Sequence, residues 1–148
     1  MVKVEVSMVI RAPRKEVFGW FSKPENLTKY EKTVWKSTKI RKREASVVTA
    51  VQEGVILGKS AKGVFRYTCF PLEKIESVWS DGEYGEVDIK GQPITVAFAE
   101  VPEGTKVTWC VSAGVPCIGR VLGPGGEAKL EGILSEELKK MKATIEKG

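Results

Sequence analysis

The chain has 148 residues, of which 42% are hydrophobic and 29% are charged, and its formal net charge is +5. These values describe one globular domain, residues 1–148, large enough to bury a hydrophobic core. The longest apolar runs are far shorter than the roughly 18 residues of a membrane span, and the N-terminal stretch alternates in polarity instead of forming a signal-peptide core. We therefore expect a cytoplasmic protein.

Several kinds of chemistry are excluded by composition. The chain contains no histidine, so Ser-His-Asp triads, Cys-His nucleophiles and histidine metal sites are all excluded. Cys69, Cys110 and Cys117 form no C-x-x-C pair, so neither a disulfide framework nor a zinc site is predicted. The acidic stretch 81–88 lacks the ligand spacing and the central glycine of a calcium loop. We expect no bound metal.

The first elements alternate between strand and helix. Residues 2–11 place apolar side chains at every second position, which predicts a strand with one buried face. Pro13 suits the first turn of a helix, and Pro24 disfavours helical geometry in the residue before it. A helix that carries Val17, Phe18, Trp20 and Phe21 is therefore expected to end near residue 23. A second short helix is expected over residues 24–31.

The rest of the chain predicts strands and then one helix. Strands are expected over 33–42, 45–53, 57–69, 72–80, 84–101 with a break near 91–93, and 104–112. Asp81-Gly82 and Pro102-Glu103-Gly104 are turn signals of an antiparallel meander. From about residue 126, apolar residues recur at spacings of three and four, which predicts a long amphipathic C-terminal helix. The sheet is the only surface large enough to cover that helix, so the expected fold class is α+β.

Three stretches carry a resemblance to a known superfamily. The stretch MVIRAPRKEVFGWFSKPENLTKY resembles the strand-helix opening of START-like, or helix-grip (SRPBCC), proteins, in particular their polyketide cyclase/dehydrase-like branch. FPLEKIESVWSDG and EVPEGTKVTW look like the central and last strands of that superfamily. The resemblance implies a curved antiparallel sheet of about seven strands wrapped around the C-terminal helix. It also implies a pocket for a hydrophobic small molecule.

In such a fold, alternation along the strands and the spacing of apolar residues along the helix predict which side chains line the cavity. The predicted lining is mostly apolar. Phe18, Trp20 and Phe21 are expected to close the base of the cavity, although core packing alone also explains them. The nominated ligand-binding residues are Phe65, Tyr67, Trp79, Phe98 and Trp109 from the sheet and Leu134, Leu138 and Met141 from the helix. Arg66 and Tyr67 are adjacent, so only one of them can face the cavity.

Two further motifs have a weaker functional reading. GPGGEA, residues 123–128, superficially matches a dinucleotide fingerprint, but too little chain follows for the parallel strand that the fingerprint needs. We expect no cofactor, and interpret these glycines as the entry to the long helix, with a gate at the pocket mouth as the alternative.

KSTKIRKR, residues 36–43, is basic, with Lys39, Arg41 and Arg43 expected on one strand face. It is interpreted as a solvated edge strand, with transient docking to an anionic membrane or an acidic protein as the alternative; no nucleic-acid partner is expected.

The sequence thus predicts a non-catalytic carrier or sensor of a hydrophobic or amphipathic, lipid-like small molecule. Two alternatives stay open. One is an enzyme resembling polyketide cyclases and dehydrases, in which Tyr67 or a buried carboxyl does general acid/base work. The other is a protein-interaction adaptor that resembles chaperone activators or accessory proteins of redox enzymes.

Overall fold

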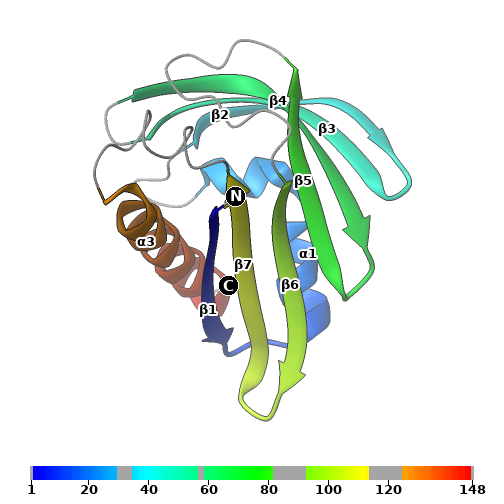
Figure 1. Ribbon diagram of the computed structural model, residues 1–148. Coiled ribbons are helices and arrows are strands. Elements are labelled where there is room, and N and C mark those ends of the chain that lie inside the picture. The colour runs from blue at the N-terminus through cyan, green and yellow to red at the C-terminus, as the bar shows by residue number, and fades with distance from the viewer. Residues whose placement is uncertain (1, 30–34, 57–58, 82–92, 114–124, 148) are drawn as a thin grey trace.

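The computed structural model describes residues 2–29, 35–56, 59–81, 93–113 and 125–147 (Figure 1). Strand β1 is followed by helix α1 and the short 3-10 helix η1, and six more strands precede the C-terminal helix α3. The bounds are β1 Val2–Ile10, α1 Arg14–Phe21, η1 Pro24–Thr28, β2 Trp35–Glu44, β3 Val47–Ile56, β4 Lys59–Phe70, β5 Lys74–Asp81, β6 Pro93–Val101, β7 Gly104–Ala113 and α3 Gly126–Lys147.

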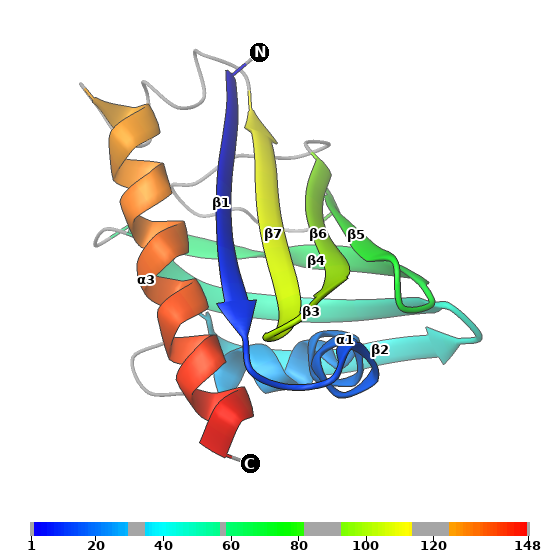
Figure 2. The same cartoon turned by 90° about the horizontal axis from the view of Figure 1, so that it is seen from below.

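The strands form one seven-stranded antiparallel sheet in the order β1-β7-β6-β5-β4-β3-β2. The sheet is strongly twisted, and Figure 2 shows β2, β3 and β4 running across the direction of β1 and β7. Helix α3 lies on the inner side along β1, while α1 and η1 cover the other end of the same side. The expected helix-grip architecture is thereby confirmed.

The strand register explains why one face of the sheet is buried. Residues that are paired across neighbouring strands point to the same face. One such row runs from β1 to β3 through buried or half-buried side chains: Val4, Val111, Ile94, Ser77, Tyr67 and Val48. The next row toward the β6–β7 hairpin contains Val6, Trp109, Val96, Ile75 and Cys69. Against these rows α3 packs its buried residues Leu134, Leu138, Met141 and Ile145.

The turn between β1 and α1 is held by the hairpin between β6 and β7. Thr105 Oγ1 donates a hydrogen bond to the Ala12 carbonyl at 2.9 Å. Gly104 has a φ of +145°, and a Cβ placed there would lie 2.3 Å from the Ile10 carbonyl oxygen. Only glycine therefore allows the hairpin to approach the end of β1 this closely.

The C-terminal end of α3 is fixed to the same end of β1. Lys142 Nζ donates to the Val9 carbonyl at 2.8 Å, and the Arg11 backbone N–H donates to Glu146 Oε2 at 2.8 Å. Lys142 and Glu146 also pair with each other at 3.1 Å. The hydrogen bond from Arg11 is the main cause that lowers the pKa of Glu146.

Two expectations about local structure are wrong. Lys39 pairs with Val51, whereas Arg43 pairs with the buried Val48, because the register shifts between Ile40 and Lys42. Arg41 is the extra residue of this β-bulge. Lys39 and Arg43 therefore face opposite sides of β2, and the expectation that they share a face is incorrect.

The second helix also differs from its expectation over residues 24–31. It is a 3-10 helix over Pro24–Thr28, since its N-terminal proline starts it and such helices stay short. Asn26 Nδ2 donates to the Trp20 carbonyl at 2.8 Å and joins η1 to α1. Residues 30 and 31, at the end of the expected helix, lie outside the described residues.

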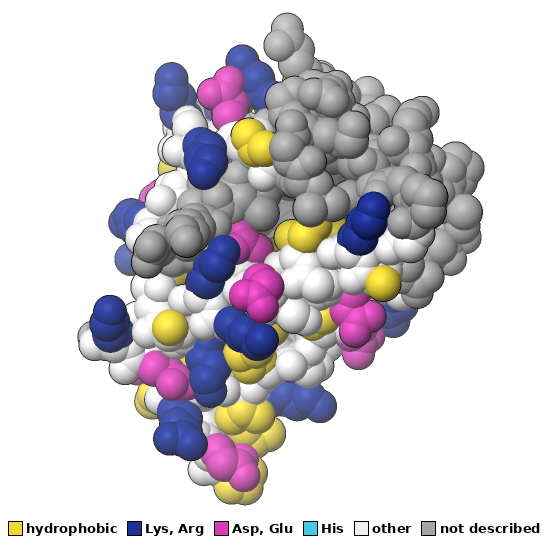
Figure 3. Space-filling model, turned by 90° about the vertical axis from the view of Figure 1, so that its left-hand side faces the viewer, with side chains coloured by type: hydrophobic (Ala, Val, Ile, Leu, Met, Phe, Trp, Pro, Cys, Tyr) yellow, Lys and Arg dark blue, Asp and Glu magenta, His cyan; other side chains and the backbone are white. Residues whose placement is uncertain are grey.

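The described surface carries both signs of charge. On the side of α3, Figure 3 shows basic and acidic side chains interspersed along the described part of that face. Lys139–Glu136 and Lys140–Glu137 are examples on α3, at 3.5 and 3.2 Å. Within the described ranges, no helix is both long and apolar enough to cross a membrane.

We predict that Gly104→Ala lowers the free energy of unfolding by about 1–3 kcal/mol, because the residue must leave its strained backbone region or push away the Ile10 carbonyl. Gly132→Ala is the control: Gly132 is helical with nothing within 4 Å of an added Cβ, so stability should rise by about 0.5–1 kcal/mol. Urea unfolding measures both variants. Equal effects of the two substitutions would contradict the close approach at Gly104.

We predict that the stabilisation from Glu146 depends on pH. Because its pKa is lowered in the folded protein from the ordinary 4.5, the stabilisation is present above that value and is lost as the pH falls through the lower, folded value. Glu146→Gln should therefore be less stable than the parent at neutral pH. The two unfolding midpoints should converge in acid, and a gap that stays constant with pH would show that the carboxylate charge plays no part.

Candidate functional site

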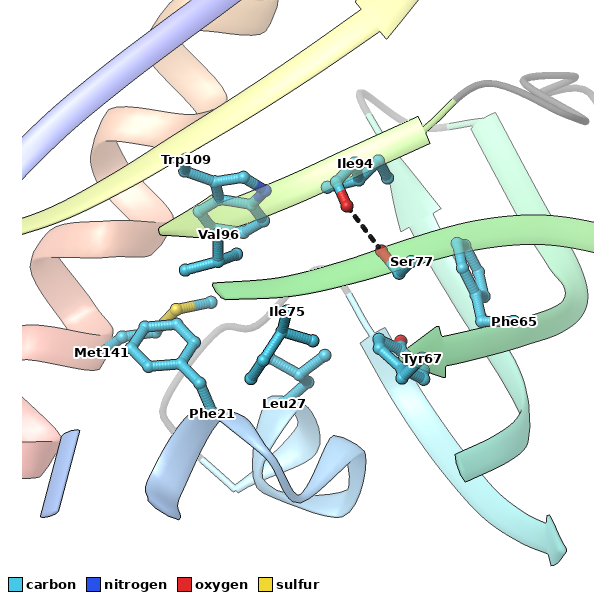
Figure 4. A pocket seen from close by; sticks show the side chains of 10 residues that line it. All are labelled: Phe21, Leu27, Phe65, Tyr67, Ile75, Ser77, Ile94, Val96, Trp109 and Met141. Carbon is cyan, nitrogen blue, oxygen red and sulfur yellow. Dashed lines mark hydrogen bonds between the residues drawn. The ribbon is translucent and has the colours of Figure 1, made fainter. Parts of the chain in front are cut away.

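A cavity of about 60 Å³ lies between the inner face of the sheet, α1 with η1, and α3. Figure 4 shows its lining side chains converging from these three layers. Eight of them are apolar and two carry a hydroxyl group: Phe21, Leu27, Phe65, Ile75, Ile94, Val96, Trp109 and Met141, with Tyr67 and Ser77. Such a lining fits an apolar small molecule with few polar contacts.

Two wider grooves lie on the outside of the molecule. One, of about 340 Å³, runs between α1, η1 and the end of α3, and includes Glu16, Lys23 and Thr144. The other, of about 380 Å³, lies between α1 and the β2–β3 turn, and includes Arg43 and Cys69. Both are more open to solvent than the cavity, so they withdraw less of a ligand surface from water. The cavity is therefore the candidate site.

Four of the nominated residues line this cavity: Phe65, Tyr67, Trp109 and Met141. Leu134 and Leu138 of α3 are buried in the core but do not line the cavity. Trp79 pairs with Phe65 in the β4–β5 ladder, and its side chain lies outside the described residues.

Phe98 does not line the cavity, and aromatic rings from α1 cover its side chain. The rings of Phe18 and Phe21 meet the Phe98 ring edge-on, with centroids 5.4 and 5.5 Å apart. Trp20 packs edge-on against Phe21 at 5.1 Å. Phe21 belongs both to this cluster and to the cavity lining, whereas Phe18 and Trp20 do not line the cavity, so of the three aromatic residues expected to close its base only Phe21 reaches it.

Leu27 of η1 lines the cavity and was not nominated from the sequence, and neither were four residues of the sheet: Ile75, Ser77, Ile94 and Val96. They share the inner face with the residues that were, since Ile75 pairs with Val96 and Ser77 with Ile94. Strict alternation along β5 and β6 would have found them. Their side chains are smaller than the aromatic residues that were expected to line the cavity.

A buried polar chain crosses β4, β3 and β2 beside the cavity. The Tyr67 hydroxyl donates to Gln52 Oε1, and Gln52 Nε2 donates to Thr38 Oγ1 at 3.2 Å. Gln52 is fully buried, and it alternates with the inward-facing Val48 and Ala50. Its position in this alternation marks it as a buried polar residue, which the sequence analysis missed.

The comparisons with known proteins agree with this geometry. Residues 1–146 match the sequence profile of a family described as polyketide cyclase / dehydrase and lipid transport. The chain belongs to this family. The family lies within the SRPBCC superfamily, as the resemblance implied. A search among curated proteins finds no match.

Solved structures share the fold at low sequence identity. TTHA0849 from Thermus thermophilus is 20% identical with a TM-score of 0.78, covering 97% of each chain. The ZhuI aromatase/cyclase from Streptomyces sp. R1128 is 11% identical with a TM-score of 0.72, covering 98% of this chain and 93% of that one. The Aha1 dimer from Colwellia psychrerythraea is 16% identical with a TM-score of 0.67, covering 99% and 97%.

For a member of the polyketide cyclase/dehydrase and lipid transport family, the titration of Tyr67 bears on catalysis. Burial raises the pKa of Tyr67 far above its usual range, and the hydrogen bond with Gln52 opposes this effect only in part. The phenol therefore stays neutral near pH 7, and its hydrogen is already donated to Gln52. An efficient general base or acid needs a pKa near the working pH, so Tyr67 is poorly suited to that role. Arg66, its neighbour in β4, is exposed.

Nucleophilic and metal chemistry has little support in the described residues. Cys69 and Cys110 are half-buried free thiols, and burial raises the pKa of Cys69 against the opposing charge of Arg43. A thiol with a raised pKa is a poor nucleophile at neutral pH. Among the described residues, no group of three or more His, Cys, Asp or Glu could hold a metal ion. Cys117 and acidic residues 83–88 lie outside those residues.

We predict that Tyr67→Phe lowers the free energy of unfolding by about 1–3 kcal/mol, because Gln52 Oε1 loses its donor in the interior. Gln52→Leu should cost a similar amount by leaving the Tyr67 hydroxyl without its acceptor. The double variant should cost clearly less than the sum, since both partners are then apolar. Urea unfolding of all four proteins measures the coupling, and strict additivity would contradict the polar chain.

Proposed function

We propose that this protein binds a neutral, mainly apolar small molecule in the cavity between the sheet and α3, as a carrier or sensor. The observation that carries the proposal is the lining: eight apolar side chains, two hydroxyl groups, and no charged side chain among the described residues that form it. A charged ligand group would lose its hydration there without an ionic partner. The description of the family, which names lipid transport, supports the same class of ligand.

The cavity volume limits how such a ligand enters. About 60 Å³ is far below the roughly 300–1,000 Å³ of small-molecule pockets. It accommodates a few water molecules or a small group at most. Binding therefore requires lining side chains to move apart. Met141 is suited to this because its unbranched side chain repacks easily.

The enzyme alternative keeps some support from the family description and from the fold shared with an aromatase/cyclase. Against it, Tyr67 is the only ionisable side chain among the described lining residues, and its phenol stays neutral near pH 7. We therefore infer binding without turnover. Cytoplasmic location stays a prediction.

The docking alternative rests on exposed basic residues of β2. Lys39 and Arg41 are exposed, but the Arg43 guanidinium is bound to Glu25 at 2.7 Å and ties β2 to η1. Fewer cations of this strand are thus available for an anionic partner than its sequence suggests. A transient contact of Lys39 and Arg41 with a membrane or protein would accompany ligand exchange and would not replace it.

We predict that Val96→Phe weakens ligand binding at least about tenfold, because the larger side chain fills a cavity with little spare volume. The neutral fluorescent dye phenylnaphthylamine serves as the probe, and its emission is titrated with protein. Val55→Phe is the matched control, since Val55 is 44% exposed on β3 and does not line the cavity. Circular dichroism checks that both variants are folded.

Equal dye binding by the two variants would place the dye elsewhere and contradict the proposal. Native mass spectrometry of freshly purified protein is an independent test. An adduct that denaturation releases, and that Val96→Phe lacks, supports a carrier and identifies the class of ligand. Turnover of such a molecule would instead favour the enzyme alternative.

A further inference from the structure

The indole N–H of Trp109 is a buried donor in the cavity lining. Its Nε1 atom is inaccessible to solvent and has no hydrogen-bond partner among the described residues. Buried donors are normally paired, so one without a partner calls for an explanation. Trp109 lies on β7 opposite Val96, and Figure 4 shows its indole nitrogen on the side of the ring toward Ile94.

The neighbouring polar groups already have partners of their own. The Tyr67 hydroxyl donates to Gln52, and the Ser77 hydroxyl donates weakly to the Ile94 carbonyl at 3.4 Å. The backbone groups of β6 and β7 around Trp109 are paired in their ladder. The remaining described lining is hydrocarbon or thioether. Among the described lining residues, the Trp109 N–H is thus the donor that a ligand could still pair once the side chains part.

We propose that the ligand carries a carbonyl group, a ketone or an ester, whose oxygen accepts the hydrogen bond of the Trp109 indole N–H. This inference rests on the proposed function. A carbonyl adds an acceptor and no further donor, so it pairs Trp109 and leaves nothing unsatisfied. A carboxylate would also accept, but the described lining holds no cation to compensate its charge.

Two probes of equal size separate the carbonyl from the hydrocarbon part of the interaction. Acetophenone and isopropylbenzene have the same number of non-hydrogen atoms and the same branching, with a carbonyl oxygen in one where the other has a methyl group. The indole N–H and backbone N–H signals of isotopically labelled protein are followed by NMR during titration with each probe. The Trp109 signal is identified by its absence in Trp109→Phe.

We expect acetophenone to move the Trp109 indole proton downfield, and isopropylbenzene to leave it nearly in place. In Trp109→Phe, the dissociation constant of acetophenone relative to that of isopropylbenzene should rise by about threefold to tenfold. The phenyl ring of the variant leaves the same extra space for both probes, which are of similar volume. Its effect on the two dissociation constants therefore cancels in their ratio. Trp20→Phe, which alters a tryptophan outside the cavity lining, should leave the ratio unchanged.

The outcomes distinguish the two proposals. If both probes shift the lining residues but the Trp109 proton and the ratio show no preference for the ketone, the carbonyl inference is overturned while an apolar binding site stands. This is also the result expected if ordered water pairs the indole N–H. If neither probe perturbs the lining, the proposed function fails, and the carbonyl inference fails with it.

Discussion

The apolar stripe of α3 can leave water only by lying against the inner face of the sheet, and the other features of the fold depend on that contact. The sheet twists strongly, so that β1 at one edge lies along the helix while β2 at the other edge packs against η1. At the end of β1 the contact is fixed by hydrogen bonds from Lys142 and to Glu146. Away from that end, the sheet curves off the helix, and the space between them is filled by side chains of uneven size. The cavity is what this filling leaves over.

The interior between the layers combines apolar packing with a few polar contacts. Tyr67, Gln52 and Thr38 form a chain that crosses three strands, so a slip in register between β3 and β4 would break it. The chain therefore helps to specify the pairing of these strands as well as to stabilise it. Trp109 differs because its indole N–H has no partner in the described structure. The paired Tyr67 hydroxyl therefore stabilises the fold, whereas the unpaired Trp109 N–H is the group that we propose for ligand recognition.

The regular elements could be predicted from the sequence because their periodicity was uninterrupted. Alternation in β1 and the spacing of Leu134, Leu138, Met141 and Ile145 in α3 each defined a buried face, and the structure buries those faces. Strict alternation predicted the wrong face for residues that follow a β-bulge. The extra residue at Arg41 turned Arg43 toward η1, and nothing in the local alternation of charges announced it.

The volume of the cavity could not be predicted from alternation along the strands, for a different reason. Its position follows from the register, but its volume depends on how the side chains of three layers interlock. Phe98 illustrates this: it has the inward parity of a lining residue, yet the rings of Phe18 and Phe21 cover it. Periodicity identifies which residues face inward, whereas only the packed structure separates those that touch a void from those that fill it.

The small volume of the cavity has a consequence for kinetics. If a ligand enters only after the lining has parted, the competent conformation is a minor one, and the apparent affinity falls in proportion to its population. Uptake then reaches a plateau at high ligand concentration, because the rate of opening limits it and diffusion does not. The same closure slows release, since the occupied site must reopen before the ligand can leave. Such a protein retains its cargo through a barrier to exchange more than through the strength of any single contact.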